Sequence, residues 1–228
     1  MFGLKPYSTS VVDRLSARQF ASVRIVREAG LRGRILDVGC GPGWFEYLMR
    51  DDGLDLFGVE PSSSALDVAK VSAPIAHFSS GSALELGYAD ASFDGAVMFE
   101  VIEHVPRGTE AKALGEVRRV LRAGAPFVLS TPYADLRSMM FDPAWYLGHR
   151  HYRRERLKRL FYDAGFDVSQ TFVFGGTWEV STMALFYLCK WLLRSEIPWQ
   201  DVIEKRRAKE FDSAAKGFSN IFVVARAR

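Results

Sequence analysis

Three glycines on alternate positions follow an apolar run in the segment ILDVGCGPG (35–43). Glycine reaches backbone conformations that other residues avoid and lets a ligand approach the main chain closely. This spacing therefore favours a ligand-binding turn over a turn that only reverses the chain. Asp37 stands at the end of the apolar run, directly before Gly39, Gly41 and Gly43, where its carboxylate would repel a pyrophosphate. The loop suits a ligand that carries positive charge.

Two common glycine loops do not match this one. A phosphate-binding P-loop needs a lysine and then a serine or threonine after its last glycine, and Trp44 follows Gly43 instead. A dinucleotide fingerprint needs its third glycine three residues after the second, so that helix and strand pack closely. S-adenosylmethionine carries a sulfonium and an ammonium group and no phosphate, so it suits an acidic residue at this point.

The chain has four histidines, which are its candidates for a general base. A base that removes the proton of a hydroxyl acceptor accelerates a reaction by about 10²–10⁴-fold. His77 lies in a strand pattern, and we interpret it as structural. His104 follows the fourth strand, at the carboxyl edge where open α/β sheets bind ligands, while His149 and His151 follow the fifth. We expect His104 or His149 to be catalytic.

The segment EVIEH places Glu100, Glu103 and His104 at i, i+3 and i+4, which is one face of a helical turn. Two carboxylates and an imidazole can bind a divalent metal, and His149 could supply a fourth ligand. The competing interpretation is a scaffold turn with His104 facing the acceptor. We favour the scaffold turn and assign no metal ligand, which leaves metal dependence as an alternative.

These residues need a parallel sheet to bring them together, and the rest of the sequence predicts one. Strands are expected at 34–38, 56–59, 75–78, 94–99, 126–130, 167–174 and 219–226, and helices near 11–29, 43–50, 62–70, 110–122 and 153–164. This alternation predicts an α/β fold with a doubly wound, mostly parallel seven-stranded sheet and helices on both faces. We expect residues 1–228 to form a single domain, with a helical insertion at 178–216 before the last strand.

The glycine segment resembles the cofactor loop of the Rossmann-like (class I) S-adenosylmethionine-dependent methyltransferases. GSALELGYADASFDGAVMFEVIEHV (81–105) and VRRVLRAGAPFVLSTPY (117–133) are similar to later motifs of the same family, so the resemblance covers more than half of the chain. The sequence around EVIEH also resembles the corresponding motif of the ubiquinone-pathway O-methyltransferases and of the small-RNA 2′-O-methyltransferases. The resemblance implies a methyltransferase with S-adenosyl-L-methionine as its cofactor.

The resemblance also assigns cofactor contacts residue by residue. Residues of the first loop would shape the methionine end: Asp37, Gly39, Cys40, Gly41 and Gly43. Glu60, followed by Pro61, would accept the two ribose hydroxyls, and Ser82 with Ala83 would hold the adenine. Ser82 stands where the family commonly has Asp, so adenine recognition should depend on the backbone at Ala83 and on packing by Leu84. Phe99 and Glu100 would close the site from the fourth strand.

The acceptor pocket is expected in MMFDPAWYLGH (139–149), an apolar and aromatic segment at the position where the family builds its substrate lid. Such a lining suits an aromatic or lipid-like acceptor, and core packing would explain some of the same residues. The basic run at 150–159 forms an amphipathic helix. A solvated basic face and a contact with an anionic group both remain open for it.

Composition limits the partners and the compartment. A net charge of +3 and the lack of an extended basic patch disfavour nucleic acid. Two cysteines, and an N-terminal segment without a hydrophobic core, predict a cytoplasmic protein. The apolar run at 183–193 is shorter than the roughly 20 residues of a spanning helix. For the insertion we favour a buried cap or a homodimer surface over a peripheral membrane contact.

We therefore expect O-methylation of a small or lipid-linked acceptor. One alternative is a metal-assisted O-methyltransferase of a catechol or of an RNA 2′-hydroxyl. The other is a non-catalytic cofactor-binding module that acts through contacts with partners.

Overall fold

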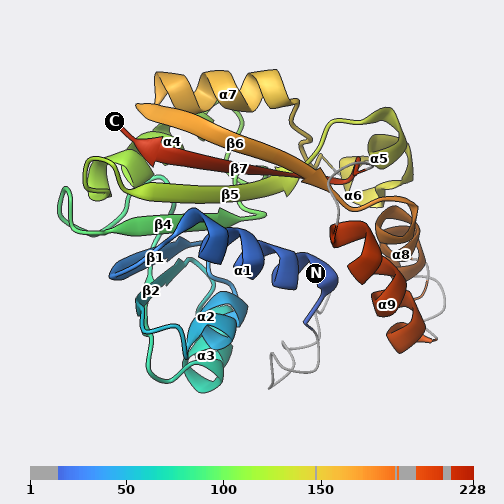
Figure 1. Ribbon diagram of the computed structural model, residues 1–228, viewed down its shortest axis with the longest axis horizontal. Coiled ribbons are helices and arrows are strands. Elements are labelled where there is room, and N and C mark those ends of the chain that lie inside the picture. The colour runs from blue at the N-terminus through green and yellow to red at the C-terminus, as the bar shows by residue number, and fades with distance from the viewer. Residues whose placement is uncertain (1–14, 147, 188, 190–198, 213–216) are drawn as a thin grey trace.

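The centre of the molecule is a seven-stranded sheet. The computed structural model describes residues 15–146, 148–187, 189, 199–212 and 217–228. The strand order is β3-β2-β1-β4-β5-β7-β6, and β7 is antiparallel to both of its neighbours (Figure 1). The strands are β1 (Arg34–Val38), β2 (Asp55–Glu60), β3 (His77–Ser80), β4 (Gly95–Phe99), β5 (Pro126–Pro132), β6 (Phe166–Phe174) and β7 (Asn220–Ala227). The predicted fold class is confirmed.

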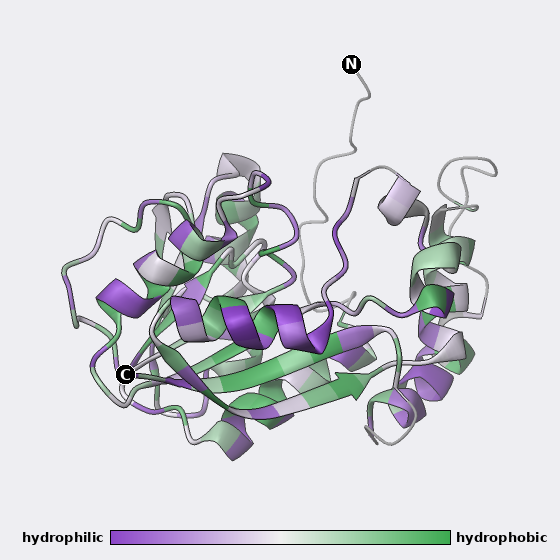
Figure 2. Ribbon diagram, turned by 90° about the horizontal axis from the view of Figure 1, so that it is seen from above, coloured by the Kyte–Doolittle hydropathy of each residue, from purple (hydrophilic) through white to green (hydrophobic). Residues whose placement is uncertain are grey.

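Helices cover both faces of the sheet, which is why every residue of β4 and β5 is buried. One core cluster joins the sheet to α4 (Glu110–Val120) and α7 (Arg154–Asp163). The other joins it to α1 (Ala17–Ala29) and α2 (Trp44–Met49), and α3 (Ser63–Ser72) packs beside α2 and β3. Hydropathy follows this arrangement, since the inner strands are largely hydrophobic in Figure 2.

Parallel pairing brings the carboxyl ends of the central strands to one edge. Asp37 of β1 pairs with Gly58 of β2 on one side and with Val97 of β4 on the other. Because β7 is antiparallel, its first residue, Asn220, pairs with Pro132 at the carboxyl end of β5. Residues from the beginning of β7 therefore reach the same edge as residues from the ends of β1, β2 and β4.

The sequence misplaced the third strand by two residues and missed two helices. The strand expected at 75–78 begins at His77, because Pro74 opens a turn that the amide of Ala76 closes on the carbonyl of Ala73. The lid segment contains two short helices, α5 (Leu136–Phe141) and α6 (Pro143–Tyr146). Asp135 caps α5 by accepting a hydrogen bond from the amide of Arg137, a side-chain cap that favours helix initiation.

The segment predicted as an insertion, 178–216, includes α9 (Gln200–Phe211) and all but the first residue of α8 (Thr177–Tyr187). Both helices lie beyond the carboxyl edge together with α5 and α6 (Figure 1). The carboxylate of Glu210 accepts hydrogen bonds from the amides of Gly176, Trp178 and Glu179, and so caps the first turn of α8. Glu179 also forms a buried ion pair with Arg207 at 2.6 Å. These contacts hold the two helices together, although they are separated in sequence.

Part of the apolar run at 183–193, and the start of the helix expected at 11–29, lie outside the described residues. None of the helices in the described ranges is long and apolar enough to cross a membrane.

Candidate functional site

The glycine loop lies at the carboxyl end of β1, directly before α2. Gly39, Gly41 and Gly43 have φ angles of 80°, 53° and 79°, a region that residues with a Cβ atom seldom occupy. A Cβ atom on Gly39 would lie 2.4 Å from Val101 Cγ2, and one on Gly43 would lie 2.9 Å from the Cα atom of Ala69. The loop is thus packed against the turn after β4 and against α3, while a Cβ atom on Gly41 would meet open space.

The carboxyl group of Asp37 is buried next to this loop. Asp37 is 2% exposed, and its Oδ1 atom has no hydrogen-bond partner among the described residues. Burial, together with the negative charges of Glu46 and Glu60, raises the pKa of Asp37 well above its usual range. A buried acceptor without a donor is costly. A positively charged ligand at the loop would supply what Asp37 lacks, so the residues fit the cofactor that the sequence suggested.

Glu46 is a component that the sequence reasoning missed. It belongs to α2, is fully buried, and neither of its carboxyl oxygens has a hydrogen-bond partner in the described part of the chain. Burial raises the pKa of Glu46 to about 8. The available signal was its place in WFEYLM (44–49), where it is the one charged residue in an otherwise uncharged run.

Glu60 ends β2 as expected, and its carboxylate joins two backbone segments. Oε2 accepts a hydrogen bond from the amide of Gly41 at 3.2 Å, and Oε1 accepts one from the amide of Ser62 at 3.0 Å. The side chain therefore links the glycine loop to the start of α3 and retains lone pairs for further donors. Pro61 is exposed beside it. The contact of Glu60 with the ribose stays a prediction.

Ser82 and Ala83 form a turn after β3. The Ser82 hydroxyl accepts a hydrogen bond from the amide of Leu84 at 3.1 Å. The backbone carbonyl group of Ser82 accepts one from the amide of Glu85 at 3.1 Å. Ser82 is exposed, whereas Ala83 and Leu84 are half-buried. The hydroxyl thus organises its own turn, and the adenine assignment stays a prediction.

Cys40 and Phe99 turn their side chains into the core. Cys40 is fully buried, and burial and the nearby carboxyl group of Glu46 raise the pKa of its thiol. The Phe99 ring packs against Trp44 and Phe45, with centroid distances of 5.4 and 5.7 Å. Any contact of Cys40 with the cofactor would therefore come from its backbone, and Phe99 supports α2 from β4.

Glu100 is tied to three donors from three elements. Its Oε1 atom accepts a hydrogen bond from Ser130 Oγ at 2.7 Å. Its Oε2 atom accepts one from Arg18 Nη1 at 2.8 Å and one from Asn220 Nδ2 at 3.0 Å. The residue has a φ angle of 55°, which is unusual for a side chain with a Cβ atom. Glu100 therefore connects α1, β5 and β7 at the edge of the site.

The three candidate metal ligands in EVIEH (100–104), which are Glu100, Glu103 and His104, do not surround a common site. Glu103 is buried and accepts a hydrogen bond from Thr131 Oγ1 at 3.0 Å, and burial and the charge of Glu100 raise its pKa. His104 is exposed instead. Within the described ranges, no group of three His, Cys, Asp or Glu residues is placed to hold a metal ion.

His104 and His149 come together in the structure. Their ring centroids are 4.4 Å apart and their planes lie at 74°. His104 Nε2 lies 4.0 Å from Glu103 Oε1. The side chain of His104 is 54% exposed, and its partial burial, together with the nearby His149, lowers its pKa. His77 is distant from this pair in the fold, on β3, and its ring stacks on Phe57 at 4.7 Å. The pair that the sequence singled out therefore shares one location.

Arg150 was expected on a basic helix face, and the structure corrects this. Its side chain is 10% exposed and donates hydrogen bonds to the carbonyl groups of Ile102, Glu103 and Val105. It also forms an ion pair with Glu110 at 2.6 Å. The periodicity of the run could not show that its first arginine lies before the helix. Arg150 instead holds the turn that carries His104.

His151 is the other unexpected member of this segment. It is buried, with Nε2 2.9 Å from Asp142 Oδ2 and Nδ1 3.1 Å from the carbonyl oxygen of Tyr133. These contacts attach the segment between α5 and α6 to the chain that follows β5. His151 is therefore a structural residue of the lid.

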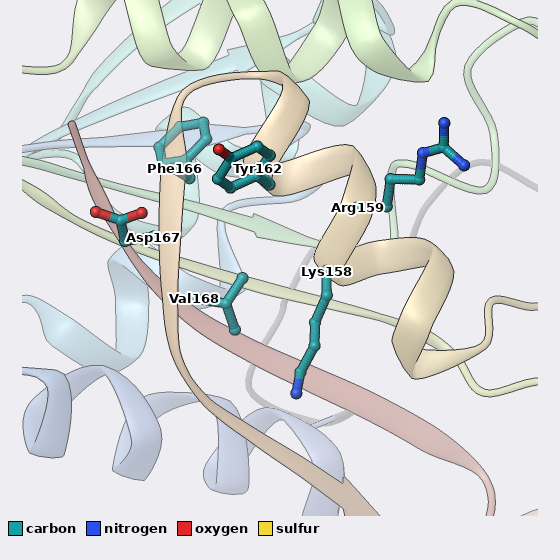
Figure 3. Close-up of a pocket in the computed structure, with 6 residues that line it drawn as sticks. All are labelled: Lys158, Arg159, Tyr162, Phe166, Asp167 and Val168. Carbon is teal, nitrogen blue, oxygen red and sulfur yellow. The ribbon is translucent and has the colours of Figure 1, made fainter.

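Two surface pockets differ in their relation to this site. One, of about 260 Å³, is lined by Trp145 and His149 among others, and so adjoins the histidine pair. The other, of about 420 Å³, lies between α7 and the beginning of β6 and is lined by Lys158, Tyr162 and Asp167 among others (Figure 3). The second pocket lies at the opposite end of the sheet from the glycine loop.

The chain is similar to several known proteins. The model of a methyltransferase-domain family matches residues 10–171. A probable S-adenosylmethionine-dependent methyltransferase of Mycolicibacterium smegmatis is 33% identical over 141 residues, covering 60% of this chain and 53% of the relative. A ubiquinone biosynthesis O-methyltransferase of Aromatoleum aromaticum is 31% identical over 127 residues, covering 51% and 52%. The chain spans about half the length of these curated relatives.

Solved structures share the fold at lower identity. The [4+2]-cyclase SpnF superposes with a TM-score of 0.68 at 20% identity, covering 92% of this chain and 81% of that one. A possible histamine N-methyltransferase of Thermotoga maritima gives a TM-score of 0.63 at 20% identity, covering 93% and 91%. At these identities the likeness concerns the fold alone.

Proposed function

This chain belongs to the methyltransferase-domain family, and on that premise we propose that it transfers the methyl group of S-adenosylmethionine to a hydroxyl group of a small or lipid-linked acceptor. When bound, the cofactor supplies an electrophilic methyl group on a sulfonium. Methyl transfer is an in-line displacement, so much of the protein's contribution is alignment, which can supply up to roughly 7–11 kcal/mol of a barrier.

The cofactor side of the proposal is supported by the surroundings of the glycine loop. Asp37 offers a cationic ligand a buried oxygen that has no partner among the described residues, and the loop has open space at Gly41. Glu60 stands at the end of the neighbouring strand, where its carboxylate can accept hydroxyl donors. The two acids would thus recognise opposite ends of one extended ligand.

One observation carries the choice of a hydroxyl acceptor, namely the pairing of the His104 and His149 rings at 4.4 Å. The turn that carries His104 touches the glycine loop through Val101 and Gly39. The lowered pKa of His104 favours its neutral form, and a neutral imidazole nitrogen can accept the acceptor's proton. A base next to the cofactor loop is what a hydroxyl acceptor requires.

The lid supports an apolar body for the acceptor. Several large apolar side chains on α5 and α6 are exposed, which are Leu136, Met140, Trp145 and Tyr146. The insertion helix α8 packs against both of these helices. We assign α8 and α9 to a cap over the acceptor, and light scattering would test the alternative of a homodimer. Both cysteines are free and buried, in keeping with a cytoplasmic protein.

The reaction needs a direct test, because a cyclase shares this fold and a fold does not define a reaction. The experiment is a mass-spectrometric screen of hydroxylated acceptors with isotope-labelled S-adenosylmethionine. We expect a labelled methyl ether, formed at a rate that His104→Ala or His149→Ala reduces by about 10²–10⁴-fold.

The control variant is His77→Ala, which removes an imidazole distant from the site and should retain the rate. If cofactor binds but both site variants keep full activity, histidine base catalysis is wrong. If the label appears on nitrogen or on carbon, the hydroxyl assignment is wrong.

A further inference from the structure

The pocket beside the histidine pair is predominantly basic. Its volume is about 260 Å³, and its lining includes Arg107, Glu110, Trp145, His149, Arg150 and Arg156. Three guanidinium groups therefore face one carboxylate in this lining. A small oxyanion is much smaller than this volume, so the pocket can hold one together with part of the molecule that carries it.

The single carboxylate is already occupied. Glu110 Oε1 accepts hydrogen bonds from Arg150 Nη1 at 2.6 Å and from Arg156 Nη2 at 3.4 Å. Its Oε2 atom accepts a hydrogen bond from the amide of Gly108 at 2.9 Å. Glu110 neutralises one positive charge, and the pocket keeps an excess of positive charge with no second acid in its lining.

The three arginines differ in what they can offer a ligand. Arg150 is nearly buried and holds the carbonyl groups of the EVIEH turn, so it is structural. The side chain of Arg156 is 58% exposed, and among the described residues it makes only the long contact with Glu110 and lies over the Tyr152 ring. Arg107 is exposed and has no hydrogen bond or ion pair with any residue in the described ranges. Arg107 and Arg156 therefore have free donors.

We propose that this pocket binds an oxyanion of the acceptor, a carboxylate or a phosphate, through Arg107 and Arg156. Guanidinium groups bind both oxyanions in a bidentate manner and remain charged at every physiological pH. Trp145 forms the aromatic part of the same lining and packs against the body of the acceptor. His149 lines the pocket and touches His104, so a hydroxyl group elsewhere on the acceptor lies at the histidine pair.

This inference rests on the proposed function and narrows its substrate class to acidic hydroxyl compounds. It also assigns a role to the basic segment at 150–159. One arginine there stabilises the turn, and another binds the ligand. Neutral and cationic acceptors would leave the charge of the pocket uncompensated and would bind less tightly.

The test uses three catechols that differ in one substituent. They are 3,4-dihydroxybenzoate, 3,4-dihydroxybenzyl phosphate and the neutral 3,4-dihydroxybenzamide. Binding of each to the cofactor-free protein is measured by calorimetry, and KM and kcat are measured separately. The variants are Arg107→Gln and Arg156→Gln, and the matched control is Arg159→Gln, which removes one charge from an exposed position outside the pocket.

We expect at least one of the two anions to bind about 10–100-fold more tightly than the amide, the range of one charged hydrogen bond. Arg107→Gln and Arg156→Gln should each reduce this preference about tenfold, through binding and KM rather than kcat, while Arg159→Gln preserves it. The tighter of the two anions then identifies the carboxylate or the phosphate as the preferred group.

Equal binding of the amide and both anions, or a preference that survives both arginine variants, would overturn the inference even if all three catechols are methylated. Conversely, arginine-dependent binding of an anion without any methylation would support the anion site and exclude these catechols as acceptors, and the screen of hydroxylated acceptors would then decide the proposed function.

Discussion

Replacing Glu46 by glutamine should change how the stability of the protein depends on pH. The side chain is fully buried in α2, and neither oxygen has a hydrogen-bond partner among the described residues. Desolvation disfavours the charged form and raises the pKa of Glu46 from 4.5 to about 8. In the folded protein the carboxyl group therefore keeps its proton at neutral pH, whereas in the unfolded chain it has lost it.

The sign and size of the effect follow from this difference. Between pH 4.5 and 8 the folded state binds one more proton than the unfolded state, so the free energy of unfolding falls as pH rises. The slope is about 1.4 kcal/mol for each pH unit, and the full loss is about 5 kcal/mol across the interval. Glutamine has nearly the same shape and does not ionise, so the variant lacks this contribution.

The assay is urea unfolding of the cofactor-free protein at pH 5.5, 6.5 and 7.5. The free energy of unfolding of the wild type should fall relative to that of Glu46→Gln by about 2–3 kcal/mol from the lowest to the highest pH. Glu155→Gln removes an exposed carboxylate from α7 and serves as the control. Parallel pH profiles for wild type and Glu46→Gln would refute the reasoning, because they would mean that Glu46 ionises freely in the folded protein.

Four other results are expected. Glu60→Ala should weaken S-adenosylmethionine binding by about 1.5–3 kcal/mol for each charged hydrogen bond lost, as measured by calorimetry, and an unchanged affinity would remove the ribose assignment. Because partial burial and His149 lower the pKa of His104 from its ordinary value of 6.5, kcat/KM should rise with pH on the acid side of 6.5, and this acid limb should be absent in His104→Ala. Trp145→Ala should raise KM for the acceptor and leave kcat nearly intact, since uniform binding is lost; a fall in kcat alone would contradict this. Chelator treatment should leave turnover largely unchanged, and activity restored only by Mg²⁺ or Zn²⁺ would favour the metal-assisted alternative.

The sequence by itself determined the sheet and the loop at its edge. The bounds of β1 were predicted without error, and the other strands were located to within about two residues, because apolar runs between helical patterns are local signals. The glycine loop is local for the same reason. The φ angles that Gly39, Gly41 and Gly43 adopt exclude most other residues, and this requirement shows in the sequence as glycine.

The sequence could name His104 and His149 as candidates but could not bring them together. Their contact depends on how the lid segment returns over the carboxyl edge. Arg150 holds the turn on both sides of His104 by donating hydrogen bonds to the carbonyl groups of Ile102, Glu103 and Val105. In sequence, Arg150 was one arginine of a basic run, indistinguishable from those that face solvent. A hydrogen bond to a distant carbonyl group leaves no periodicity that could have marked it.

Tertiary structure alone also decided the electrostatics of the site. Glu46 and Glu100 are both acids, and their neighbours in the sequence do not show which of the two carboxyl groups is charged. The fold buries Glu46 with no donor from the described residues, and it surrounds Glu100 with donors from α1, β5 and β7. Whether a carboxyl group is charged depends on the atoms around it in space, and for these two residues those atoms come from elements far apart in the chain.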